Sequence, residues 1–237
     1  MNKLRKIILS LIVIFLFGCT SKVDTNPFKL NYQKYELLNS SLDFDNAKGV
    51  DCTLNLNVDG VTKNISSSFD VFERGYNDYI YNVKYKENGV EYSSYYDNEL
   101  DYINNNNEKY IRKTLLNAYK NFVLRYVHLD FETISITGIE SITVKDDTIE
   151  IMLNESGIID YFNDVYYRNK MSIEPNDYKE GKVSMELKVQ DDTLKSIIVE
   201  GEIQYKQSKA TIKETISLRE ANAFEKPNDI ESYIVIK

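Results

Sequence analysis

Residues 53–62, TLNLNVDGVT, contain the pattern that decides the fold. Leu54 and Leu56 fall on one face of an extended chain and the intervening asparagines on the other, because successive side chains of a strand point to opposite sides. The run ends at Asp59-Gly60, a dipeptide that favours the tight turn of a β-hairpin. The stretch therefore predicts two antiparallel strands with one buried and one solvated face.

Similar alternating runs recur along most of the chain, separated by turn-forming pairs such as Asn88-Gly89, Asp146-Asp147 and Asp191-Asp192. Residues 133–153 predict two strands joined at Gly138 and a third after Asp146-Asp147. The remaining predicted strands are residues 66–72, 78–87, 90–97, 100–104, 182–189, 194–206, 210–220 and 233–237.

Two segments have apolar residues at steps of three and four, which is typical of amphipathic helices. The first is residues 107–129, with Asn107 as the expected cap and a stripe of Ile111, Leu115, Tyr119, Phe122, Val123 and Tyr126. The second is residues 154–169, with Asn154 or Ser156 as the cap and a stripe of Ile158, Ile159, Phe162, Val165 and Tyr166. Residues 32–42 could form a further short helix.

The order of these elements predicts an α+β fold with a large, mostly antiparallel sheet. Single strands and helices do not alternate along the chain, as they would in a fold with a parallel sheet. No Pro/Gly-rich linker interrupts the chain after residue 50. We therefore expect residues 31–237 to form one β-rich domain, preceded by a polar tether at residues 19–30.

The N-terminus has the features of an export signal. Lys3, Arg5 and Lys6 precede an apolar run at residues 7–17, which is shorter than the roughly 20 residues that a spanning helix needs. We therefore expect residues 1–18 to be a signal peptide.

The end of this signal, Leu16-Phe17-Gly18-Cys19, resembles the lipobox of bacterial lipoproteins, although Phe17 is larger than the residue usual at its position. The resemblance implies that the Cys19 thiol is joined to diacylglycerol, that the leader is cut just before Cys19, and that acyl chains such as palmitate anchor the protein. The expected location is the extracytoplasmic face of the bacterial cell membrane.

Composition excludes several classes of function. The net charge is −8, and removal of the three leader cations makes the chain more acidic still, which argues against nucleic acid as a partner. A lone histidine, His128, and the absence of nucleophile, phosphate-loop or dinucleotide motifs predict no metal site, no cofactor and no enzyme activity. Cys52 is in phase with Leu54 and Leu56, so we expect a buried thiol.

The whole layout resembles the LolA/LppX-like lipoproteins. The resemblance rests on the leader, on residues 89–110 (GVEYSSYYDNELDYINNNNEKY), on the helix–strand–helix order, and on residues 187–206 (LKVQDDTLKSIIVEGEIQYK). It implies a curved half-barrel of about eleven strands, two main amphipathic helices on its concave face, and a cavity between them for acyl chains or another apolar small molecule.

Two functions remain open from the sequence. The protein carries a lipid or other hydrophobic ligand in that cavity, or it is a non-enzymatic interaction or sensory lipoprotein with a filled core that contacts another envelope protein. A carrier would use the inward helix stripes as its lining, namely Leu115, Tyr119, Phe122, Tyr126, Ile158, Phe162 and Val165.

Overall fold

The computed structural model describes residues 26–40, 48–75, 78–127, 134–169 and 178–236 of the 237-residue chain. The predicted signal peptide, the lipobox residues Leu16 to Cys19, and His128 lie outside these residues.

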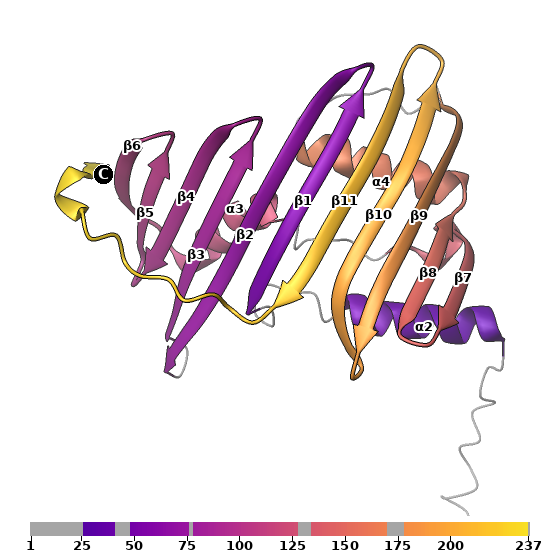
Figure 1. Ribbon diagram of the computed structural model, residues 1–237, viewed down its shortest axis with the longest axis horizontal. Helices are drawn as coiled ribbons and strands as arrows, with labels where there is room; N and C mark the ends of the chain where they lie inside the picture. The colour runs from indigo at the N-terminus through magenta and orange to yellow at the C-terminus, as the bar shows by residue number, and fades with distance from the viewer. Residues whose placement is uncertain (1–25, 41–47, 76–77, 128–133, 170–177, 237) are drawn as a thin grey trace, which may run out of the picture.

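One wide sheet of 12 strands forms the body of the protein (Figure 1). Its order is β12-β6-β5-β4-β3-β2-β1-β11-β10-β9-β8-β7. Every neighbouring pair is antiparallel except β12 and β6. The strands are β1 (Gly49–Val58), β2 (Val61–Gly75), β3 (Asp78–Glu87), β4 (Val90–Asp97), β5 (Leu100–Asn105), β6 (Glu108–Lys113), β7 (Ile139–Lys145), β8 (Thr148–Leu153), β9 (Tyr178–Gln190), β10 (Thr193–Tyr205), β11 (Lys209–Arg219) and β12 (Ile234–Ile236).

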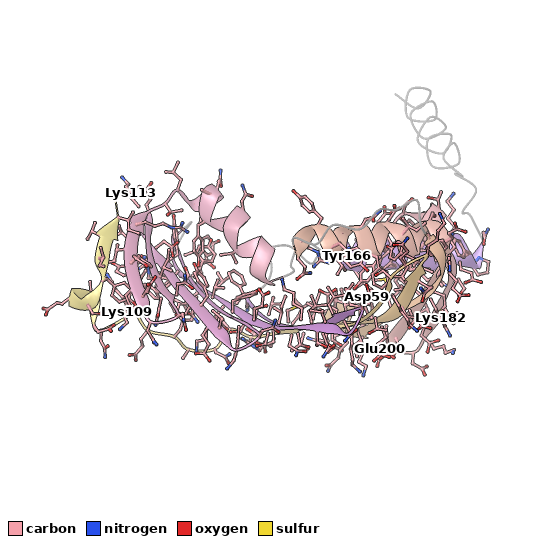
Figure 2. All side chains as sticks on the ribbon, turned by 90° about the horizontal axis from the view of Figure 1, so that it is seen from above. Asp59, Lys109, Lys113, Tyr166, Lys182 and Glu200 are labelled. Carbon is pink, nitrogen blue, oxygen red and sulfur yellow. The ribbon has the colours of Figure 1, made fainter. Side chains whose placement is uncertain are left out.

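The sheet is curved and not closed, and its helices lie on one side of it (Figure 2). We call the face under the helices the inner face and the opposite face the outer face. The predicted class, an α+β fold with a large antiparallel sheet, is confirmed, with 12 strands where the family resemblance implied about eleven.

Three helices occur in the described residues, where two main helices were expected. Helix α3 (Leu116–Val127) contacts β1, β2 and β3, and α4 (Glu155–Arg168) contacts β8 and β9. Helix α2 (Pro27–Ser40) packs against β7 and β10. The helix suggested for residues 32–42 therefore exists, and it begins early enough that residues 27–30, assigned to the tether, are helical.

The start of α4 follows from its sequence. Asn154 caps the helix, as predicted, because its Oδ1 accepts a hydrogen bond from the Gly157 backbone N–H at 3.2 Å. Gly157 packs against the short helix η1 (Ile136–Gly138), where an added Cβ would lie 2.0 Å from the Gly138 carbonyl oxygen. A residue without a side chain is therefore required at this contact.

Two of the predicted secondary-structure elements were wrong. Residues 108–113 form β6 rather than the first turns of a helix, because Asn106 and Asn107 both adopt positive φ (50° and 72°) and close a tight hairpin after β5. Asn107 is thus a turn residue and not a helix cap. Ile136 and Thr137 belong to η1 instead of the end of a strand, and Gly138, predicted as the turn before the next strand, is the last residue of η1.

The C-terminal segment crosses the outer face from the end of β11 to β6 (Figure 1). Phe224 packs edge-to-face on Tyr95, with ring centroids 6.1 Å apart, and the Lys226 ammonium lies 4.8 Å from the Tyr102 ring centroid. The segment ends in β12, which extends the sheet beside β6. No helix among the described residues is long and apolar enough to span a membrane.

Candidate functional site

The proposed ligand-lining residues are mostly packed inside the protein. Tyr119 and Phe162 are 0% exposed, Val165 is 1% and Ile158 is 3% exposed. Leu115 precedes α3 and is 64% exposed, so it belongs to the surface. The side chains of Phe122 and Tyr126 lie outside the described part of the structure.

These exposed fractions test whether the predicted cavity lies beside the helix stripes. A cavity that admits water leaves accessible area on the side chains that form its wall, so a side chain with none borders no such space. Tyr119, Phe162 and Val165 belong instead to one continuous apolar cluster that extends along the inner face from Tyr81 to Leu187. At these positions the space between sheet and helices is filled by protein.

Beneath α4 this apolar layer contains a group of polar and charged side chains. Glu214 of β11 is 0% exposed and accepts a hydrogen bond from the Tyr161 hydroxyl at 2.9 Å. The Arg168 Nη1 lies 3.5 Å from Glu214 Oε1, and its Nε donates to Asp164 at 2.7 Å. Burial acts against the Arg168 charge, but Glu214 and Asp164 outweigh it and raise the pKa of Arg168. The four groups fix α4 to the sheet.

A second polar group lies beneath α3. Ser94 donates to Asp101 at 2.5 Å and is 3.3 Å from the Tyr119 hydroxyl, while Arg112 binds Asp101 through Nη2 at 2.8 Å. Burial raises the pKa of Asp101, although hydrogen bonds from Ser94 and Arg112 act in the opposite direction. Each half of the inner face thus has one buried carboxylate bound by an arginine and near a helix tyrosine.

Cys52 is buried on the inner face, as its phase with Leu54 and Leu56 predicted, and is 1% exposed. Burial, followed by the nearby Glu214 charge, raises the pKa of its thiol well above the usual range. The neutral thiol is a poor nucleophile. Among the described residues, no group of three or more His, Cys, Asp and Glu side chains is placed to hold a metal ion.

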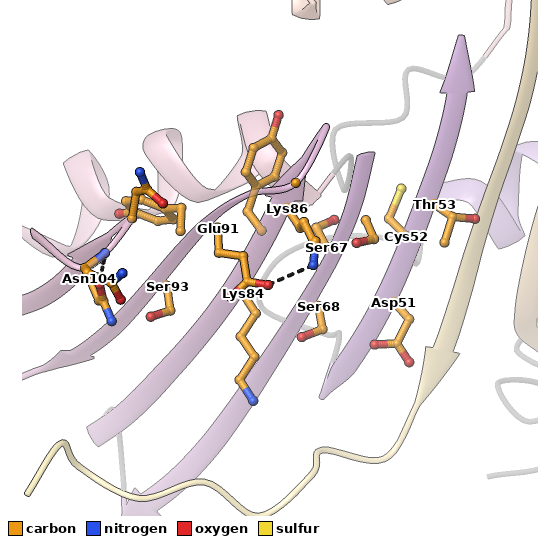
Figure 3. Close-up of a pocket in the computed structure, with 16 residues that line it drawn as sticks. Asp51, Cys52, Thr53, Ser67, Ser68, Lys84, Lys86, Glu91, Ser93 and Asn104 are labelled. Carbon is orange, nitrogen blue, oxygen red and sulfur yellow. Dashed lines mark hydrogen bonds and ion pairs between the residues drawn. The ribbon is translucent and has the colours of Figure 1, made fainter. Parts of the chain in front are cut away.

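The outer face contains a groove of about 700 Å³ across β1 to β5 (Figure 3). One row of its side chains, each on a neighbouring strand, is Asp51, Ser68, Lys84, Ser93 and Asn104. A second row is Thr53, Ser66, Lys86 and Glu91. We call these nine residues the outer groove.

The charges of the outer groove are largely paired. Asp51 accepts two hydrogen bonds from Arg219, at 2.7 and 2.9 Å. Glu91 accepts one from Lys86 at 2.8 Å, drawn in Figure 3. Lys84 lies in the middle of the first row between Ser68 and Ser93, and no acidic side chain of the described residues forms an ion pair with it. A smaller groove of about 430 Å³ lies farther along the same face, over β7 to β11.

Comparison with known proteins assigns no family to this chain. No family model matches it, and no curated protein matches it. Among solved structures, a DUF1329 family protein from Desulfovibrio piger aligns over 82% of this chain and 94% of its own, at 11% identity and a TM-score of 0.27. Rv2717c from M. tuberculosis aligns over 72% and 91%, at 7% identity and a TM-score of 0.28.

A third solved structure, a LolA superfamily protein from Nitrosomonas europaea, aligns over 86% of this chain and 96% of its own, at 8% identity and a TM-score of 0.26. The chain thus has distant structural similarity to proteins of the kind that its layout resembles.

The outer groove and the buried acids were not predicted from the sequence. Polar residues on alternate strand positions look like an ordinary solvated face, so nothing marked Lys84 or its neighbours. A signal did exist for Glu214, because it falls in phase between the apolar Ile212 and Ile216. A buried acid in an apolar row requires a partner. The partner of Glu214 is Arg168, which lies 46 positions earlier in the chain, on α4.

Proposed function

We propose that this protein is a membrane-anchored extracytoplasmic lipoprotein, not an enzyme, that acts by binding through its surface over a filled core. The observation that carries this proposal is the packing of Tyr119 and Phe162, which are 0% exposed and so leave no water-sized space beside them. Two grooves lined by described residues lie on the outer face, where a surface-bound partner could contact them. The lipobox resemblance at Cys19 supports the anchor.

The buried hydrogen bonds and ion pairs under the helices support the same proposal. Separating α4 from the sheet would leave Glu214 and Arg168 without each other in an apolar layer, and breaking a buried pair is costly. If the sheet and helices separated to admit a ligand, each opening would require the free energy needed to break this buried pair.

Carriage of a lipid or other hydrophobic ligand is the second candidate. It is favoured by the continuous apolar inner face, which three separate helices cover. If the helices moved apart, the exposed surface would suit acyl chains. In a carrier that opens in this way, the side chains that are packed in the core here would contact the ligand instead.

The anchor is tested by growing cells with radioactive palmitate. The wild type should be labelled and should fractionate with membranes, whereas Cys19→Ser should be unlabelled and remain as precursor or be released. Cys52→Ser is the matched control and should be labelled like the wild type. A labelled, membrane-bound Cys19→Ser protein would show that the lipobox interpretation is wrong.

Surface binding and carriage are separated by native mass spectrometry of the full chain extracted from membranes. A filled core predicts only the mass of the acylated chain and no fluorescence increase with an apolar probe such as 1-anilinonaphthalene-8-sulfonate. A co-purifying lipid, displaced by the probe in a saturable way, would establish carriage and refute the filled core.

A further inference from the structure

The outer groove has a larger volume than the groove over β7 to β11, and Lys84 gives it a cation outside the ion pairs of the described residues. Its volume of about 700 Å³ falls in the range of roughly 300–1,000 Å³ that is usual for ligand sites. Apolar pockets receive apolar ligands, but here the outward side chains are hydroxyls, amides and charged groups. A ligand for this groove must therefore form hydrogen bonds along its length.

The arrangement of the groove indicates an extended ligand. The first row places one polar side chain on each of five neighbouring strands, from Asp51 on β1 to Asn104 on β5. Neighbouring strands are about 4.8 Å apart, so the row offers hydrogen-bonding groups at that spacing over about 19 Å. A chain lying perpendicular to the strands would meet a new donor or acceptor at each step (Figure 3).

The charges in the outer groove indicate that its ligand is anionic. The two acids of the groove already have cationic partners, since Glu91 pairs with Lys86 and Asp51 shares Arg219 with Asp70. Lys84 keeps one positive charge at the centre of the row, in a chain whose net charge is −8. A carboxylate or phosphate placed here would gain a charge-assisted hydrogen bond from Lys84 and further bonds from Ser68 and Ser93.

We propose that the outer groove binds an acidic, hydroxyl-rich polymer, such as an acidic glycan or a polyol phosphate chain, with one anionic group on Lys84. The inference rests on the proposed surface-binding function and names the partner chemistry for it. Hydroxyls of the ligand would bond to the Ser and Thr side chains of both rows, and Asn104 would contact the ligand at the far end.

The proposal is tested by calorimetric titration of the full chain, purified from membranes in detergent. The probes are tetragalacturonate, which supplies carboxylates, and polyglycerol phosphate, which supplies phosphates, with maltotetraose as the neutral comparison. We expect at least one anionic probe to bind, and to bind about tenfold or more tightly than maltotetraose, since a hydrogen bond to a charged group contributes about that factor. Whichever probe binds identifies the source of the anion.

Three variants locate the binding. Lys84→Met should weaken binding of the anionic probe about tenfold or more, and Ser68→Phe should abolish it by filling the groove. Lys188→Met is the matched control, because Lys188 lies on the outer face of β9, away from the groove, and should bind like the wild type. A melting curve for each variant confirms folding.

Several results would overturn the proposal: binding of neither anionic probe, full binding by Lys84→Met, or an equal loss in Lys188→Met, which would indicate a general charge effect. None of these depends on Cys19 or on the core. Palmitate labelling and apolar-probe binding therefore report on the proposed function separately from the groove.

Discussion

Truncation of Phe162 gives a direct measure of how tightly the space between sheet and helices is filled. The ring is 0% exposed and packs against Tyr161 and Tyr166, with centroids 5.9 and 5.8 Å away. Loss of about 150 Å² of buried ring surface, at about 25 cal/mol per Å², corresponds to about 4 kcal/mol. This lies within the roughly 3–5 kcal/mol typical of such substitutions in packed cores.

We therefore expect Phe162→Ala to lower the free energy of unfolding by about 4 kcal/mol and the melting temperature by roughly 8–16 °C, at about 2–4 °C per kcal/mol for a domain of this size. Urea unfolding followed by circular dichroism suits the chain, which has no Trp and 19 Tyr. Tyr167→Ala is the matched control on the same helix, because Tyr167 is 83% exposed and its loss should change stability by less than about 0.5 kcal/mol.

The reasoning would be refuted if Phe162→Ala cost less than about 1 kcal/mol while its unfolding stayed cooperative. Such a small loss would mean that the ring already borders empty space. Saturable binding of an apolar probe by the wild type, altered by the substitution, would then favour the carrier.

Three further predictions follow from other sites. The Cys52 thiol should react slowly with a thiol reagent in the folded protein and quickly in denaturant, and fast native reaction would contradict its burial. Because burial raises the folded-state pKa of Asp101, its stabilising contribution is present below the unfolded pKa of about 4 and is lost as pH rises through the folded value. The free energy of unfolding of the wild type relative to Asp101→Asn should therefore fall from acid toward neutral pH, and a difference independent of pH would exclude this effect. Gly157→Ala should destabilise by about 1–3 kcal/mol, although alanine normally favours helices, since its Cβ would collide with Gly138; increased stability in urea would disprove the close contact.

Much of the sheet could be predicted because each of its long strands alternates apolar and polar residues. Cys52, Leu54 and Leu56 are all buried as their phase required. The Asp-Asp and Asn-Gly turns also occur where expected, since residues such as Asn88 and Asp146 tolerate positive φ. These features depend only on local sequence.

Other features depended on contacts that local sequence does not reveal. Ile111, Leu115 and Tyr119 are four residues apart, which imitates a helix, yet pairing with β5 makes Ile111 part of a strand. The exposed Leu115 then separates that strand from α3. Lys84 was not predicted as a site residue, because the row around it consists of side chains on four other strands that only the strand register brings together.

The order of strands places the two ends of the described chain at opposite edges of the sheet. Helix α2, which follows the proposed anchor, lies at the β7 end of the sheet, whereas the last strand, β12, lies at the opposite end (Figure 1). With 12 strands spaced about 4.8 Å apart, these ends are separated by about 50 Å along the sheet. In a molecule held at the membrane by Cys19, β12 would thus lie at the end of the sheet opposite the helix that follows the anchor, with the outer groove between these two ends.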